Sequence, residues 1–424
     1  MAGLKGRLLV LSWAMPPLVF PRSLQISRLL KALGDLGWQS IVVTLLPDAE
    51  PSALQDPELA RLYAGRYGLR TIDSREAIVP SPLWLRLWRR IRQLDDVTMD
   101  NWRRRAERAL RDELARNQYD ALVTFAQPWV DHLVGLRTKR RYPSLPWVAH
   151  FSDPWVDSPY LRFTSEQEER LARRQERQVI ETADAVVFVT QQTADLVMAK
   201  YPASWRSKSS VVGHGYDNDL LRLVEPSALT SGKFRVVHTG SLYGRRGPRV
   251  VLSAFADIVS DAAIRDQMEV EFIGYVGPEF ISSTTDHGLA DFVRFHGKKQ
   301  YIESLQAAAD ADLLLLIDAP AELSVFLPSK LVDYVMLRRP ILGITPPAGA
   351  SAEVLGKLGC LVVPPDDVQA VAAALRAAFV RWKAGEAAAP APDPRAAEAC
   401  EIHRVAIGFA RTLERAISAA PAQR

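Results

Sequence analysis

The chain has 424 residues, of which 48% are hydrophobic and 24% are charged, which excludes a fibrous, disordered or integral membrane protein. A chain of this length is longer than a single hydrophobic core usually serves, so we expect two domains. Two cysteines, Cys360 and Cys400, are too few for a disulfide framework or a cysteine-rich metal site, and they fit a reducing cytoplasm. The formal net charge is only +4.

The N-terminal residues follow a β-α-β pattern. Residues 7–12 are an apolar run typical of a buried strand, residues 22–36 place apolar side chains at helical spacing, and residues 39–44 supply a second strand. Such a unit predicts a parallel sheet with right-handed crossovers. The first run is short and lacks a good cleavage site, so we interpret it as a strand and not as a signal peptide. No stretch is long and apolar enough to span a bilayer.

Residues 47–117 interrupt this pattern, and we expect a helical insert there. Two clusters in it combine arginine with tryptophan: Trp84, Arg86, Trp88, Arg89, Arg90 and Arg92, and then Trp102, Arg103, Arg104, Arg105, Arg108 and Arg111. Basic, tryptophan-rich helices suit an anionic membrane surface, although a solvated helix face is also consistent. No nucleic-acid-binding motif accompanies them. We therefore expect a cytoplasmic protein that this insert can hold on the inner face of the membrane, and no nucleic-acid partner.

The alternation of strands and helices then resumes. Further strands are expected at 121–125, 147–151, 185–189, 234–239, 268–273, 293–296, 312–317, 341–345 and 361–363. Residues 225–233 and 386–394 have the composition of linkers, and a final amphipathic helix is expected at about residues 396–419. We expect an α/β protein with two Rossmann-like, doubly wound parallel-sheet domains, at 1–224 and 234–385, facing an inter-domain cleft. The last segment, 386–424, should pack back on the first domain.

Residues 327–334 carry a possible anion site. Pro328 suits the first position of a helix that should end before Pro340. Lys330 falls in the first turn, where the helix dipole disfavours a cation unless an anion is shared with the free backbone N–H groups. Asp333 lies on the same face and can accept from a hydroxyl. Phosphate followed by ribose, as in a nucleoside diphosphate, fits this order; the alternative is a solvated Lys–Asp pair.

Residues 238–248 form a glycine-rich turn between a strand and a helix. Glycines at 240, 244 and 247 let the backbone approach a ligand, and Arg245 and Arg246 offer forked donors to phosphate oxygens. The strand should end at the same sheet edge as Lys330, so we expect both turns to contact one pyrophosphate. A flexible turn with solvated arginines is the alternative.

These motifs resemble those of the family 4 retaining glycosyltransferases with the GT-B fold, of the bacterial polysaccharide and O-antigen type. Residues 240–248 match the family's Gly-Ser-Leu-Tyr-Gly-x-Arg-x-Pro pattern, and residues 328–334 match Pro-Ser-Lys-x-x-Glu-Tyr. The resemblance implies that Arg246 and Lys330 stabilise the diphosphate and that Asp333 binds the ribose. It further implies a donor site that includes Gly240, Ser241, Tyr243, Gly244, Arg245 and Ser329.

The first domain resembles the family more loosely, and there it implies an acceptor site. Residues 147–155 are similar to an Asp-x-Arg-Asp-Pro-Trp segment and residues 212–217 to Asn-Gly-x-Asp, so Asp153, His150 and His214 are the acceptor-side candidates. His132 is a further polar residue near an expected strand end, although a structural role is open for each of these. The chain has Val325 in place of the first acid of the family's Glu-x7-Glu motif and Ser152 in place of an arginine. The residues after the first strand, 16–21, lack the usual glycine.

The resemblance implies transfer of a sugar from a nucleotide-diphosphate sugar, held by the C-terminal domain, to a saccharide acceptor held by the N-terminal domain. In bacterial surface polysaccharide synthesis this acceptor is expected to be lipid-linked. No Asp-x-Asp motif stands at a strand end, so we expect no metal and no cofactor. A sugar-nucleotide epimerase on the same fold and a non-catalytic sugar-nucleotide-binding protein remain as alternatives.

Overall fold

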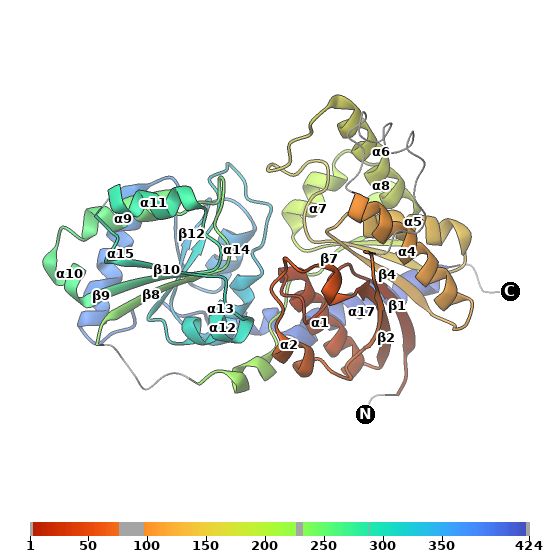
Figure 1. The fold of residues 1–424 in the computed structure, drawn as a ribbon, viewed down its shortest axis with the longest axis horizontal. Helices are drawn as coiled ribbons and strands as arrows, with labels where there is room; N and C mark the ends of the chain where they lie inside the picture. Colours follow the sequence, from red (N-terminus) through yellow and green to blue (C-terminus); the bar gives the residue numbers. More distant parts are fainter. Residues whose placement is uncertain (1–2, 76–96, 226–231, 287, 421–424) are drawn as a thin grey trace. The chain divides into compact units, whose positions relative to one another are not determined.

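The structure, a computed structural model, describes residues 3–75, 97–225, 232–286 and 288–420 (Figure 1). The tryptophan–arginine cluster at residues 84–92 therefore lies outside the described residues. The chain forms two compact units. The first unit is Met1–Gly213 with Val405–Arg424, and the second unit is His214–Arg404.

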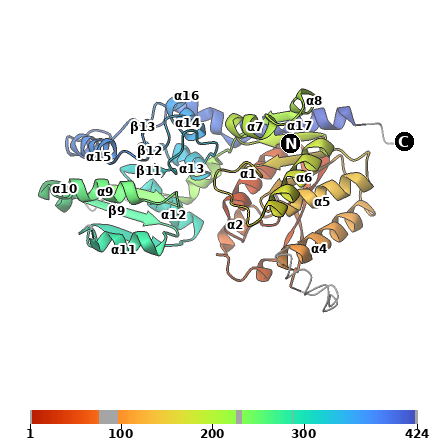
Figure 2. The same ribbon diagram turned by 90° about the horizontal axis from the view of Figure 1, so that it is seen from above.

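The first unit is built on a seven-stranded parallel sheet in the order β3-β2-β1-β4-β5-β6-β7. Its strands are β1 (Gly6–Leu11), β2 (Trp38–Leu45), β3 (Gly68–Ile72), β4 (Ala121–Ala126), β5 (Trp147–Phe151), β6 (Ala185–Phe188) and β7 (Ser209–Val211). Its helices are α1 (Pro21–Asp35), η1 (Pro47–Ala49), α2 (Pro57–Leu62), α4 (Val97–Leu114), α5 (Val130–Arg141), α6 (Glu166–Thr182), α7 (Gln191–Met198), α8 (Ala203–Arg206) and most of α17 (Ile402–Ala419). Helices lie on both faces of the sheet (Figure 2), which explains why β4 and β5 are buried along their whole length.

The first unit differs from the sequence predictions in its insert, in Trp102 and in the short edge strand β7, which was not expected. The insert at 47–117 contains an edge strand, β3, whose side chains are mostly half-exposed or exposed, so it lacks the apolar run that marks a buried strand. Trp102, interpreted as part of a membrane-facing cluster, is completely buried in the core. Its indole Nε1 donates to Oδ1 of Asp131 at 2.7 Å, so this tryptophan faces no surface.

The second unit is built on a six-stranded parallel sheet in the order β10-β9-β8-β11-β12-β13. Its strands are β8 (Phe234–Thr239), β9 (Met268–Ile273), β10 (Val293–Gly297), β11 (Leu313–Ile317), β12 (Ile341–Ile344) and β13 (Leu361–Val363). Its helices are η2 (Asn218–Leu223), α9 (Arg249–Ile258), α10 (Ala262–Gln267), α11 (Pro278–Asp286), α12 (Tyr301–Ala309), α13 (Lys330–Leu337), α14 (Ala350–Lys357), α15 (Val368–Lys383), α16 (Pro394–Ala397) and η3 (Glu398–Cys400). The two sheets with their covering helices confirm the prediction of two Rossmann-like, parallel α/β domains.

The segments around the expected linkers pack against the units. Tyr216 bonds through its backbone to Cys400 and Ile402, which joins residues 214–224 to the second unit and not to the first. In the segment 386–394, Ala388 and Ala389 are buried in the hydrophobic core of the second unit.

The C-terminal helix α17 packs on the first unit. The ring of Phe409 is fully buried and stacks on Phe125 of β4 at 6.3 Å between centroids. Arg415 Nη2 donates to Oγ of Ser210 on β7 at 2.7 Å. Among the helices of the described residues, none combines the length and the apolar character needed to cross a membrane.

Candidate functional site

The turn after β8 is held in a fixed shape by the neighbouring strand. The backbone N–H of Gly240 donates to the carbonyl of Ile273 at 2.7 Å, and that of Leu242 donates to the carbonyl of Tyr275 at 2.8 Å. Gly240 has a φ of +99°, a conformation that favours glycine. These bonds fix the path of the chain as it leaves the carboxyl end of β8.

The arginine pair lies at the tip of this turn. The backbones of Tyr243 and Arg246 exchange two hydrogen bonds of 3.1 Å, so Gly244 (φ +55°) and Arg245 are the two central residues of a tight turn. Arg245 is exposed and donates through Nη2 to the carbonyl of Pro320 at 3.2 Å. The side chain of Arg246 is only 26% exposed and faces inward. The two arginines thus occupy different environments.

Helix α13 approaches the same turn from β11. It begins at Lys330 and not at Pro328, because Pro328 supplies a carbonyl to Leu331 while Ser329 takes the N-cap position. Ser329 makes no side-chain cap, so it leaves the N–H groups of the first turn to other partners. The buried Tyr334 accepts through its hydroxyl from the backbone N–H of Thr239 at 2.8 Å. This bond ties α13 to the end of β8.

The two turns bring their cations to one place. Lys330 Nζ lies 2.9 Å from Nε2 of His238, a residue of β8. A Cβ atom at position 240 would lie only 2.7 Å from the same Nζ, so the lysine side chain crosses directly over Gly240. Arg246 Nη2 lies 3.8 Å from Oδ1 of Asp318, the residue that follows β11. The structure therefore brings together Arg246, Lys330 and Gly240 from separate segments.

The charged side chains of this cluster are two cations, Lys330 and Arg246, and one acid, Asp318. Burial, and then the nearby charge of Arg246, lower the pKa of Lys330 to about 7, while Asp318 acts in the opposite direction. Burial and the charge of Lys330 hold the pKa of His238 well below its usual 6.5. Asp318 is 2% exposed and accepts through Oδ2 from Thr345 at 2.9 Å. One buried acid faces two cations, and this excess favours an anionic ligand.

The sequence did not single out His238, Asp318 or Tyr334 as site residues. His238 and Asp318 carried a usable signal, since each is a polar residue within or directly after a buried apolar strand. In a parallel α/β sheet, polar residues at carboxyl strand ends are where ligands bind. Tyr334 carried no such signal, because a tyrosine on the buried face of a helix is usually part of the core.

The other donor-side residues lie around this cluster. On the β8 turn, Ser241, Tyr243 and Gly244 are exposed, with Tyr243 at 59%. On α13, Asp333 is half-buried one turn beyond Lys330. Val325, at the position of the family's first acid, is buried and supplies no carboxylate.

The acceptor-side candidates come from three different segments of the chain. His150 lies within β5, 7% exposed, with its ring 4.9 Å from that of Phe125 and 6.2 Å from that of Phe409. Asp153 follows β5 and is half-buried. His214 is the first residue of the second unit. Asp153 thus lies just beyond the carboxyl end of β5, in the first sheet.

Asp153 has charged neighbours that the sequence did not reveal. Arg22, in the first turn of α1, has a pKa lowered by burial to about 10, with the charges of Asp153 and Asp131 opposing the shift. Burial raises the pKa of Asp131 to about 7, although Trp102 Nε1 and the backbone of Trp13 donate to its two oxygens. Both acids therefore lie near Arg22.

His132 is buried beside them. Its Nδ1 lies 2.8 Å from Oγ1 of Thr124, and burial, followed by the charge of Arg22, lowers its pKa to about 3. The ring is therefore neutral at physiological pH. In the part of the chain that the structure describes, no group of three His, Cys, Asp or Glu residues is arranged to hold a metal ion.

Comparison with known protein families gives two matches, which together cover most of both units. Residues 23–212 match the glycosyl transferase 4-like domain, and residues 233–379 match the glycosyl transferases group 1. No curated protein sequence matches the chain.

Solved structures share the fold at low sequence identity. Sucrose-phosphate synthase from Thermosynechococcus elongatus is 15% identical with a TM-score of 0.70, covering 98% of this chain and 100% of that one. The lipopolysaccharide outer core galactosyltransferase WaaB is 12% identical with a TM-score of 0.57, covering 96% and 99%. UDP-GlcNAc 2-epimerase from Neisseria meningitidis, bound to UDP-GlcNAc, is 10% identical with a TM-score of 0.59, covering 96% and 99%. These identities establish a common fold and no more.

Proposed function

Because the chain belongs to the family 4 glycosyltransferases with the GT-B fold, we propose that it is a retaining, metal-independent enzyme that uses a nucleoside-diphosphate sugar. The acceptor is a saccharide. One observation carries the donor assignment: Lys330 and Arg246, from separate segments, meet beside Gly240 at the carboxyl edge of the second sheet. A diphosphate supplies the negative charge that this cluster lacks.

The chemistry of the leaving group explains why this cluster suits the reaction. When the bond at the anomeric carbon breaks, negative charge builds on the departing diphosphate. Lys330, Arg246 and the N-terminal turn of α13 can stabilise that charge in place, which makes each interaction stronger in the transition state than in the ground state. Each charge-assisted hydrogen bond of this kind contributes about 1.5–3 kcal/mol. These protein cations take the role that a metal ion has in other transferases.

A screen of nucleotide sugars tests the proposal. We expect one of UDP-, GDP-, ADP- or dTDP-sugars to raise the melting temperature, since a ligand at one hundred times its dissociation constant stabilises a protein by about 2.7 kcal/mol. Differential scanning fluorimetry measures the shift, with the matching free sugar and nucleoside as controls that lack the diphosphate. If none of the four nucleotide sugars raises the melting temperature, or if the nucleosides raise it equally, the donor assignment is contradicted.

An epimerase is the second candidate, because the neisserial 2-epimerase shares the fold. Proton NMR of the nucleotide sugar selected in the screen separates the two. A transferase slowly releases free sugar and nucleoside diphosphate by hydrolysis, whereas an epimerase yields a second sugar nucleotide. A non-catalytic binding protein, which the buried Val325 favours, would leave the nucleotide sugar unchanged.

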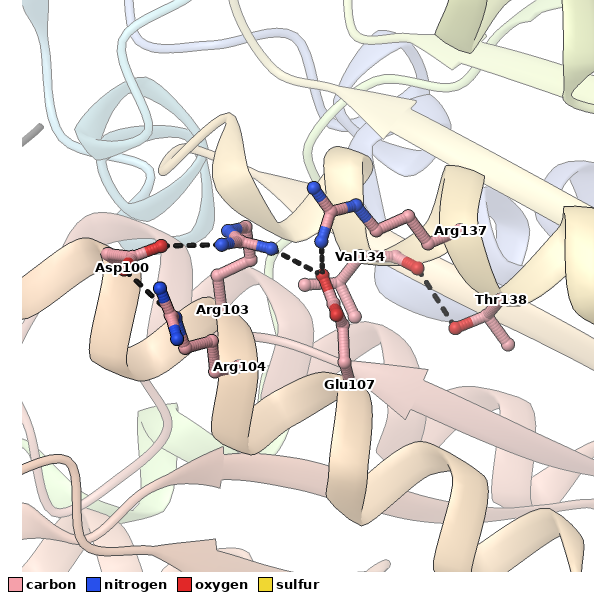
Figure 3. A network of polar contacts seen from close by, with 7 residues as sticks. All are labelled: Asp100, Arg103, Arg104, Glu107, Val134, Arg137 and Thr138. Atoms are coloured by element: carbon pink, nitrogen blue, oxygen red, sulfur yellow. Dashed lines mark hydrogen bonds and ion pairs between the residues drawn. The ribbon is translucent and has the colours of Figure 1, made fainter. Parts of the chain in front are cut away.

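We propose further that the acceptor is lipid-linked, as in bacterial surface polysaccharide synthesis, and that the protein works at the inner face of the membrane. The support is the outer face of α4 and α5, which pack side by side (Figure 3). In the network between them three arginines share two acids: Arg103 and Arg104 contact Asp100, and Arg103 and Arg137 contact Glu107. This network is therefore itself positive.

Additional cations extend this face. They are exposed residues of α4 and α5: Arg108, Arg111, Arg140 and Arg141. Each arginine near an anionic bilayer contributes about 1 kcal/mol of binding free energy. The exposed face of these helices thus fits a lipid surface even though Trp102 is buried in the core.

Replacing Arg108, Arg111 and Arg140 with alanine is expected to weaken binding to vesicles that contain anionic phospholipid by about one hundredfold, because three contributions of about 1 kcal/mol are lost. Vesicle co-sedimentation at low salt measures the change. The matched control replaces three exposed cations of the second unit, Arg265, Lys357 and Arg395, with alanine. If both triple variants lose vesicle binding equally, binding depends only on net charge. If neither loses binding, the assignment of this face to the membrane is wrong.

A further inference from the structure

His238 lies directly beneath the proposed phosphate-binding lysine, and the reaction scheme gives it no role. We propose that His238 is a positioning residue: its unprotonated Nε2 accepts a hydrogen bond from Lys330 Nζ and holds that amine over Gly240, ready for the diphosphate. The inference rests on the proposed function, since it concerns how the donor site is prepared for its ligand. Its physical basis is geometric and begins with the hydrogen bonds of the imidazole ring.

The surroundings of His238 determine which nitrogen carries the proton. Nδ1 lies 2.8 Å from the backbone carbonyl oxygen of Leu315 on β11. A carbonyl can only accept, so Nδ1 must donate, and in a neutral ring Nε2 is then an acceptor. The ring stays neutral because it is completely buried between β9 and β11, with Phe272 at 5.8 Å between ring centroids. Lys330 Nζ, at 2.9 Å, is therefore the donor to Nε2.

The neutral partner is what makes the arrangement useful. A carboxylate at position 238 would also hold Lys330, but it would form an ion pair that an incoming phosphate would have to displace. A neutral imidazole fixes the position of Nζ without cancelling its charge. This path of the lysine stem requires glycine at position 240, because a Cβ there would lie only 2.7 Å from Nζ and 2.8 Å from Cε. Glycine at 240 and histidine at 238 thus act together.

The other charged groups around Lys330 do not replace this function. Arg246, from the β8 turn, repels the lysine, and Asp318, after β11, attracts it without a hydrogen bond to it in the described structure. Asp333, on α13 itself, lies one turn further along the helix. His238 therefore makes the hydrogen bond that sets the position of Nζ.

A consequence follows for the pH dependence of binding. The pKa of Lys330 is near 7 in the free protein, and a bound diphosphate must raise it, so binding takes up a proton when the pH is above about 7. Affinity should therefore be constant below this pH and fall as the pH rises through it. The hydrogen bond to Nε2 favours the charged lysine. Loss of this hydrogen bond should lower the pKa of Lys330 in the free protein, so the decrease in affinity should begin at a lower pH.

The test compares two variants. His238→Phe keeps an aromatic ring at this position but has no hydrogen-bond acceptor, whereas the carboxamide oxygen of His238→Gln can accept in place of Nε2. The ligand is the nucleoside diphosphate (UDP, GDP, ADP or dTDP) whose sugar derivative stabilises the protein in the thermal-shift screen. Isothermal titration calorimetry at several pH values measures its affinity. We expect His238→Phe to bind about tenfold more weakly near neutral pH, with the fall beginning at lower pH. His238→Gln should remain within about threefold of the wild type.

His296, which lies on β10 and pairs with Glu271, supplies the matched control as His296→Gln, with no change expected. If the wild type binds the nucleotide and His238→Phe shows the same affinity and pH profile, the positioning role is wrong while the proposed function stands. If the wild type binds none of the four nucleotides, the proposed function itself fails.

A second measurement is made on the wild-type protein and uses a variant only to assign its signals. Long-range ¹H–¹⁵N NMR of the wild-type protein reports the tautomer of His238, with His238→Gln serving to assign its signals. We expect a neutral ring with the proton on Nδ1 at neutral pH. A proton on Nε2, or an imidazolium, would leave Nε2 unable to accept from Lys330 and would overturn the inference.

Discussion

Replacing Lys330 with alanine should lower turnover of the nucleotide sugar by about one hundredfold or more, because it removes a charge-assisted contact from the departing diphosphate. Lys330 is the first residue of α13, and its side chain lies over Gly240. The loss should appear mainly in kcat, since the contact strengthens as charge develops. Steady-state release of the nucleoside diphosphate measures it.

A second variant, Lys330→Met, separates charge from packing. Methionine keeps most of the lysine stem that lies against Gly240 but has no charge, so we expect it to lose as much turnover as the alanine variant. Lys357→Ala, at an exposed position on α14, is the control and should leave turnover unchanged. Near-normal turnover in Lys330→Met would show that the lysine only packs, and the assignment of its role would be withdrawn.

The parts of the fold that the sequence predicted are those whose residues form a long, regular pattern. The strand at 313–317 consists of buried apolar residues between two helices, and the helix at 330–337 is bounded by polar and proline residues. The two edge strands of the first sheet, β3 and β7, gave no such pattern. β3 is half solvated and β7 has only three residues, so tertiary pairing and not local sequence defines them.

Contacts between distant residues explain the remaining differences. Trp102 belongs to a basic helix, and only its bond to Asp131, which is distant in sequence, shows that it faces the core. Likewise, the sequence offered two arginines in the β8 turn, but the environments of Arg245 and Arg246 depend on Pro320 and Asp318, which lie beyond β11. Sequence patterns indicated the element on which each residue lies, whereas burial and partners depended on the fold.

The difference between the two arginines leads to the second large effect. Arg246→Ala is expected to reduce turnover by about one hundredfold or more, because Arg246 faces the same buried carboxylate as Lys330 and would contact the diphosphate beside it. Arg245→Ala should reduce turnover far less, since Arg245 is exposed and donates to the backbone carbonyl of Pro320. Steady-state turnover of the two variants gives the comparison, and equal losses would contradict the assignment to Arg246.

The pH dependence of nucleoside diphosphate binding by Arg246→Ala provides an independent test. Arg246 is the second largest cause, after burial, of the lowered pKa of Lys330, and Asp318 acts against it. Without Arg246 the lysine is left with Asp318 as its charged neighbour, so its pKa should rise above about 7. The residual affinity for the nucleoside diphosphate should then persist to higher pH than in the wild type, the opposite of the shift expected for His238→Phe. If the affinity of Arg246→Ala begins to decrease at the same pH as that of the wild type, Arg246 and Lys330 do not share one electrostatic site.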